Sequence, residues 1–155
     1  MTPIAHPYLH AIFCEDVRQE ITGKMLHIGV YSAELITPSY PLLLPKLAVV
    51  AYFGHPLEDK SSGKSWKPLS LSLVLDEEVL LELEHLNSEE TPEPLEGSRG
   101  HLMTLMMAMA PFQLARPGRL RVKIRCDNGA EVLSNALVCR VPLPSETEQS
   151  EPQQG

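Results

Sequence analysis

The feature that most constrains the fold is a strict alternation of apolar and basic residues near the end of the chain. The apolar positions are Leu120, Val122, Ile124 and Cys126, and the basic positions before them are Arg119, Arg121, Lys123 and Arg125. Successive side chains of a β-strand point to opposite faces. The stretch therefore predicts a strand with one buried face and one solvated face.

A tight turn is expected after this strand, because Asn128-Gly129 is a strong signal for a two-residue hairpin turn of type I′. Such a turn pairs the strand with the residues that follow and brings apolar side chains together on one face. The expected partners are Leu133 opposite Ile124 and Leu137 opposite Leu120. This agreement between turn and pattern supports β structure on both sides of the turn.

The rest of the chain predicts further short strands separated by turns. Strands are expected at 10–20, 25–37, 46–54 and 68–76, while 78–86 suits either a strand or one or two helical turns. Residues 101–109 are apolar on both faces; a short helix is one alternative, but a central strand buried on both sides fits the following hairpin better. With 14 prolines and 9 glycines, the chain favours an all-β fold. We expect an antiparallel β-sandwich, Ig-like or C2-like, of about seven to nine strands.

The length of 155 residues fits a single domain, expected over residues 1–144, with 145–155 as an acidic, flexible tail. Most of the net charge of −7 comes from this tail and from 87–99; without both, 12 basic and 13 acidic residues remain. A nearly neutral body argues against nucleic acid as a partner, since phosphate binding needs a clustered positive surface. The loops 55–68 and 87–100 are long enough to be either functional or disordered.

Cysteines and histidines give no disulfide or metal signature. The three cysteines, Cys14, Cys126 and Cys139, have no C-x-x-C spacing. The six histidines are scattered, and on a strand His6 and His10 would lie roughly 13 Å apart, too far to share a metal. The four methionines within 101–109 are better explained as core packing than as soft-metal ligands. No metal or cofactor is expected.

Catalytic signatures are also missing from the sequence. The chain has no nucleophile elbow, phosphate-binding loop, H-E-x-x-H motif or dinucleotide fingerprint. Cys14 precedes Glu15 and Asp16, whose charges raise a thiol pKa. Neighbouring carboxylates on a strand also point to opposite faces, so these two cannot act as an acid–base pair. A catalytic role is not expected, and a small hydrolase or metal-dependent enzyme is the weakest functional hypothesis.

A basic stripe is one candidate binding site, for an anionic partner or a protein surface. It consists of Arg116, Arg119, Arg121, Lys123 and Arg125. The alternative is a solvated face that discourages edge-to-edge aggregation.

A second charged cluster lies in the segment FCEDVR, residues 13–18. On a strand, Phe13, Glu15 and Val17 share one face and Cys14, Asp16 and Arg18 share the other, so neither face is cleanly apolar. A β-bulge near Glu15 is one explanation. We favour the other, an Asp16–Arg18 ion pair with a structural role at the rim of the sandwich.

Targeting signals are missing from the opening of the sequence. It contains no basic segment followed by an apolar run, and no stretch approaches the roughly 18 apolar residues of a membrane span. We expect a cytoplasmic protein that makes no membrane contact.

The segment 13–18 is followed by a turn at Gly23, by Gly29-Val30-Tyr31 and by Leu44-Pro45-Lys46-Leu47. This order of F-C-[DE]-D-V-R, G-V-Y and L-P-K-L resembles an uncharacterised family of short all-β proteins encoded by bacteria and phages. The rest of the chain matches only as a β-rich pattern. The resemblance implies a bacterial or phage origin and implies no activity.

The leading functional hypothesis is a non-enzymatic protein-interaction or accessory module in a bacterial or phage-infected cell, with a protein as its partner. The alternative is a structural virion or assembly subunit that forms homo-oligomers through sheet edges or the basic stripe.

Overall fold

The computed structural model describes residues 4–57, 65–86 and 95–147. These ranges contain twelve strands and one short helix, so the predicted all-β fold is confirmed with more strands than expected. Parts of the predicted loops at 55–68 and 87–100, and the end of the tail at 145–155, lie outside the described residues. Within the described part, there is no helix long and apolar enough to cross a membrane.

One sheet contains four antiparallel strands in the order β2-β1-β5-β8. These strands are β1 (Tyr8–Gln19), β2 (Met25–Tyr31), β5 (Leu47–His55) and β8 (His101–Met109). The central strand β5 is buried along nearly its whole length, as its apolar sequence predicts. β8 is an edge strand, which corrects the expected central strand at 101–109. Only one of its two apolar faces is covered by the core.

The other sheet has six strands, in the order β3-β12-β10-β6-β7, with β11 also paired to β10. These strands are β3 (Glu34–Ile36), β6 (Pro68–Leu75), β7 (Glu78–Glu84), β10 (Gly118–Cys126), β11 (Glu131–Leu133) and β12 (Leu137–Arg140). β3 and β12 are parallel, so the sheet is mixed and not purely antiparallel. The ambiguous segment 78–86 forms a strand.

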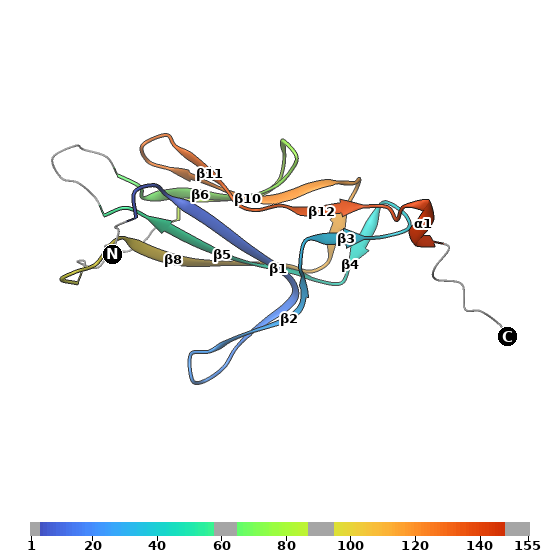
Figure 1. The fold of residues 1–155 in the computed structure, drawn as a ribbon, viewed down its shortest axis with the longest axis horizontal. Coiled ribbons are helices and arrows are strands. Elements are labelled where there is room, and N and C mark those ends of the chain that lie inside the picture. Colours follow the sequence, from blue (N-terminus) through green and yellow to red (C-terminus); the bar gives the residue numbers. More distant parts are fainter. Residues whose placement is uncertain (1–3, 58–64, 87–94, 148–155) are drawn as a thin grey trace.

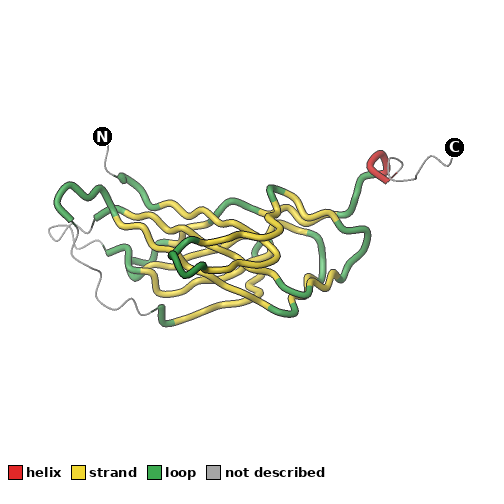
Figure 2. Tube along the Cα trace, turned by 90° about the horizontal axis from the view of Figure 1, so that it is seen from below, coloured by secondary structure: helices red, strands yellow, loops and turns green. Residues whose placement is uncertain are grey.

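The predicted long strand at 25–37 is divided between the two sheets. Its first part is β2 and its last part is β3, so the chain crosses from one sheet to the other near residues 32 and 33. A separate ribbon pairs β4 (Leu42–Leu44) with β9 (Phe112–Leu114). The chain then ends, within the described residues, with α1 (Pro144–Thr147). Figure 2 shows the strands along the long axis of the molecule and α1 at one end.

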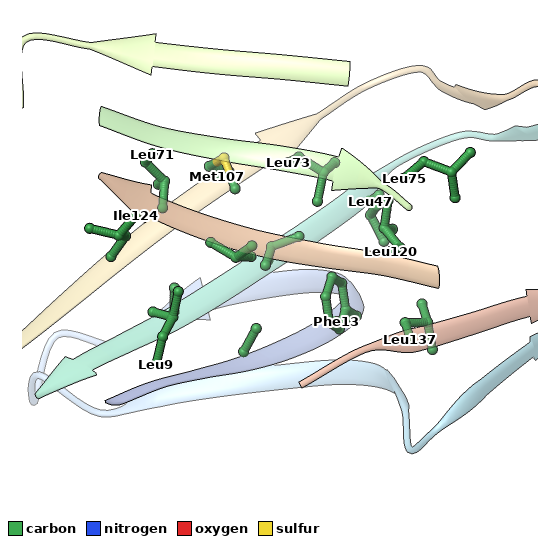
Figure 3. Packing of buried hydrophobic residues seen from close by; sticks show 14 of the residues in the cluster. Leu9, Phe13, Leu47, Leu71, Leu73, Leu75, Met107, Leu120, Ile124 and Leu137 are labelled. Carbon is green, nitrogen blue, oxygen red and sulfur yellow. The ribbon is translucent and has the colours of Figure 1, made fainter. Parts of the chain in front are cut away.

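The two sheets pack against each other around one hydrophobic core (Figures 1 and 3). The four-stranded sheet contributes Leu9, Phe13, Leu47 and Met107, and the six-stranded sheet contributes Leu71, Leu73, Leu120 and Ile124. The predicted alternation of β10 is confirmed, because all four of its apolar positions from 120 to 126 are buried.

The hairpin after β10 has a three-residue turn instead of the expected two-residue turn. Gly129 is the only residue of this turn with a positive φ, 84°, whereas a type I′ turn requires two. The extra residue shifts the register, and Ile124 lies opposite Val132, one residue before its predicted partner. Farther along the ladder the predicted pair of Leu120 and Leu137 forms.

Asn135 connects the two sheets through its side chain. β2 pairs only with the later part of β1, from Phe13 onward. The backbone of Ala11 bonds to Asn135 instead: its N–H donates to Oδ1 at 2.8 Å, and its carbonyl accepts from Nδ2 at 3.0 Å. The amide of Asn135 thus makes the two bonds that a neighbouring strand would otherwise make.

Candidate functional site

The side of the four-stranded sheet that faces away from the core carries mostly apolar side chains. We call it the outer apolar face, defined by Ile12, Leu26, Ile28, Val30, Val50, Leu102 and Met106. The alternation of each strand produces it, since residues next to core positions point outward. The strand register then aligns the outward positions in rows, such as Ile12, Val50 and Met106 across three strands.

Large side chains on this face remain at the surface. Leu26 is 47% exposed, Val30 52%, Leu102 63% and Met106 52%. Figure 1 shows no described strand or helix beyond this sheet on the side away from the six-stranded sheet. In the sequence, the apolar residues on both faces of 101–109 indicate this surface. The same pattern also predicts a strand that is buried on both sides.

A charged corner borders the outer apolar face. Arg18 Nε lies 3.3 Å from Asp16 Oδ2, and Lys46 Nζ donates to the other oxygen of the same carboxylate. The hydrogen bonds from Lys46 and then Arg18 lower the pKa of Asp16. Asp16 and Arg18 thus lie together. Sequence reasoning missed Lys46, which lowers the pKa of Asp16 more than Arg18 does, because Lys46 is 30 residues away in the chain.

Gly29 of β2 lies beside Glu15 of the segment 13–18. This residue has a φ of +63°, and a Cβ built on it would lie 2.6 Å from the carboxyl group of Glu15. The left-handed φ favours glycine at this position, and the carboxyl end of the flexible Glu15 side chain lies over the backbone of β2 there. Glu15 also lines a pocket of about 240 Å³ with Tyr31, Leu44, Pro45 and Lys46. Burial, and then the charge of Glu15, raises the pKa of Tyr31.

The residues of the predicted basic stripe lie on β10 and just before it. Arg116 precedes β10 and bonds Asp76 at 2.7 Å and Glu78 at 3.4 Å. Asp76 also accepts from the backbone N–H of Arg119. Arg119, Arg121, Lys123 and Arg125 lie along β10 at positions that alternate with its core residues, so they point away from the four-stranded sheet.

Carboxylates border the basic stripe on both sides. Lys123 Nζ lies 3.8 Å from Glu131 on β11. On the opposite side, Lys123 pairs with Ser72 of β6, which pairs with Glu82 of β7. The same order repeats one step along the strands, from Arg125 through Ser70 to Glu84. This mixture of charges suits a solvated face better than a surface for an anionic polymer.

A pocket of about 420 Å³ lies at the end of this face. It is lined by Lys67, Leu69, Glu84, His85, Leu86, Arg125 and Asp127. Two cations and two carboxylates share it, so their charges balance and it has no preference for an anion. His85 has a φ of 57°, an uncommon conformation for a residue other than glycine.

His55 and His101 come together because their strands pair at these positions. Their rings lie 5.1 Å apart, and the ring of Phe53 lies 5.3 Å from that of His55. No pattern in the sequence indicates this contact, since the two residues belong to separate strands. Over the described residues, no group of three or more His, Cys, Asp and Glu side chains gathers in a way that could hold a metal ion.

The three cysteines are free and buried. Burial raises the pKa of Cys126 and of Cys139 to about 11. The pKa of Cys14 is also raised, by burial and then by Asp16, and its Sγ lies 3.6 Å from the carbonyl oxygen of Ala48. Because the thiolate is the reactive form, none of these thiols is placed as a nucleophile.

A family model matches residues 9–135, which is most of the chain; it describes a family of unknown function, DUF6941. No curated protein and no solved structure matches the chain. The expected membership in an uncharacterised family is confirmed. A bacterial or phage origin, and an Ig-like or C2-like topology, stay predictions.

Proposed function

The chain belongs to DUF6941, a family of unknown function, and from its geometry we propose that it is a non-enzymatic protein-interaction or accessory module. The outer apolar face is the surface that binds its protein partner. The observation that carries this proposal is the set of large apolar side chains that remain exposed there, on β2 and on β8.

Exposed apolar area supports an interaction role. Leu26 and Val30 on β2, and Leu102 and Met106 on β8, expose apolar surface along the two edges of this sheet, with the buried Val50 between them. Exposed apolar patches on monomers are often functional. Burial of this surface by a partner is favoured by the hydrophobic effect. The charged corner at Asp16, Arg18 and Lys46 can make polar contacts with the partner at the border of the face.

The described side chains favour binding over chemistry. The thiols are buried, and the pocket beside Arg125 has balanced charges. As part of the proposal, we assign the module to the cytoplasm of a bacterium or a phage-infected cell, on the strength of the motif at 13–18.

Site-specific photocrosslinking in the native cells tests the proposal. A photoreactive residue is placed at Val30, on the outer apolar face, and in a separate variant at Val79, which is similarly exposed on β7. We expect discrete crosslinked species from position 30 and none from position 79. Equal crosslinking from the two positions, or none from position 30, contradicts the proposed surface.

A second candidate function is an assembly subunit that oligomerises through a sheet edge. One observation favours it. β8 ends the order of the four-stranded sheet, so among the described strands nothing pairs with its outer side.

A further inference from the structure

The outer edge of β8 is unusually well suited to pair with another strand. Its sequence HLMTLMMAM contains no proline, glycine, lysine, arginine or carboxylate. Its ladder with β5 continues from His101 to Met109 without a register shift. A long, regular, apolar edge presents a row of backbone donors and acceptors that readily accepts a further strand.

The edges formed by β7, β3 and β2 carry features that discourage pairing, and β8 lacks them. β7 carries Glu78, Glu82 and Glu84, and its ladder with β6 shifts register. β3 has only three residues and begins with Glu34. β2 contains Gly29 in a left-handed conformation. Charges, short strands and irregular backbone are the devices by which proteins protect their edges.

We infer that β8 pairs with β8 of a second copy of this chain, in an antiparallel register centred on Leu105. The two four-stranded sheets then form one continuous eight-stranded sheet, and the two outer apolar faces lie side by side. This inference rests on the second proposed function and specifies the surface and register through which the copies associate.

The side chains of β8 are complementary to themselves in this register. Leu102 lies opposite Ala108 of the other copy, so a large residue meets a small one on the outer apolar face. Thr104 lies opposite Met106 of the other copy, and Leu105 meets its own counterpart on the core side. Every directly opposed pair is uncharged, so no like charges meet across the two copies.

The interface formed by two edges is modest in size. One strand pair buries less than the roughly 800 Å² per partner of a standard interface. We therefore expect a dimer that dissociates on dilution. Pairing also lets backbone N–H and C=O groups of β8 bond to the other copy instead of to water. These bonds set the relative direction and the register of the two strands.

Sedimentation velocity, measured from low to high micromolar concentration, tests the inference. The chain of 17.2 kDa is expected to shift from monomer to twice that mass. The variant Thr104→Lys/Met106→Lys places lysines opposite each other twice and is expected to raise the dissociation constant at least tenfold. The variant Thr104→Lys/Met106→Glu places each lysine opposite a glutamate of the other copy and is expected to restore the dimer. The control Val79→Lys/Leu83→Lys, on the edge strand β7, is expected to leave it unchanged.

The outcomes separate the inference from the function on which it rests. An oligomer that persists in the double-lysine variant of β8 overturns pairing through β8 but leaves an assembly subunit standing. A wild-type monomer at every concentration overturns both. A failure of the opposite-charge variant to dimerise, with a melting temperature equal to the wild type, overturns the register centred on Leu105.

Discussion

The substitution Asn135→Ala tests how much the side chain that bonds one sheet to the other contributes to the free energy of unfolding. It removes two hydrogen bonds to the backbone of Ala11, of 2.8 and 3.0 Å. Ala11 is buried, so its N–H and carbonyl lose partners that are hard to replace. Each lost bond costs about 1 kcal/mol, and each buried group left unpaired about 1–3 kcal/mol.

A cavity next to these bonds sets the expected size of the effect. It has a volume of about 160 Å³, and both Ala11 and Asn135 line it. Water that enters this space satisfies part of the freed backbone. We therefore expect the free energy of unfolding to fall by about 2 kcal/mol, near the lower limit for two bonds, and the melting temperature to fall by about 4–8 °C.

Denaturant unfolding followed by circular dichroism measures this change, with Asn128→Ala as the matched control. Asn128 makes one bond of 2.9 Å to the N–H of Ala130 in an exposed turn. Its loss should cost less than about 1 kcal/mol. The variant Asn135→Asp keeps an acceptor for Ala11 but sets a carboxylate against its carbonyl, and at neutral pH it should lose at least as much as Asn135→Ala. If Asn135→Ala costs no more than Asn128→Ala, the reasoning is wrong.

Three further predictions concern the four-stranded sheet and α1. Gly29→Ala and Gly23→Ala should each destabilise the protein by ~1 kcal/mol, because both have positive φ and the carboxyl end of Glu15 beside position 29 can move aside; a much larger loss at position 29 in thermal unfolding contradicts this. Asp16→Asn should lower stability most at neutral pH. The pKa of Asp16 is depressed in the folded state, so its contribution is present above the ordinary value of 3.8 and is lost as the pH falls through the lower folded value; a pH-independent difference between variant and wild type refutes the pairing. Glu146 should titrate with a pKa of about 2 when its carboxyl group is followed by NMR, and a midpoint at the ordinary value of 4.5 would show that its bonds to Arg140 do not form.

The β class could be predicted because its signal is local. In β10 the alternation of Leu120, Val122 and Ile124 with basic residues specifies both the strand and the face that is buried. The turn at Gly129 could be located, but its length could not. Two- and three-residue turns begin with the same kinds of residue and differ by one step in register.

Features that depend on contacts between distant segments could not be predicted. The double apolar pattern of 101–109 is equally compatible with a central strand and with an edge strand that has an exposed outer face. Which one forms depends on whether another strand follows in the sheet. The bond from Lys46 to Asp16, and the contact of His55 with His101, likewise arise from strand order. Local spacing carries no information about that order.

The parallel pairing of β3 with β12 has a consequence for synthesis of the chain. β1, β2 and β5 are close in sequence, so their ladders can form soon after these segments leave the ribosome. β3 has its partner about a hundred residues later, with Glu34 opposite Val138, and closing so long a loop is entropically costly. The β3 segment therefore lacks its partner until β12 has been synthesised. A chain that is truncated before β12 should keep β3 unpaired, which makes this short strand a sensitive reporter of complete folding.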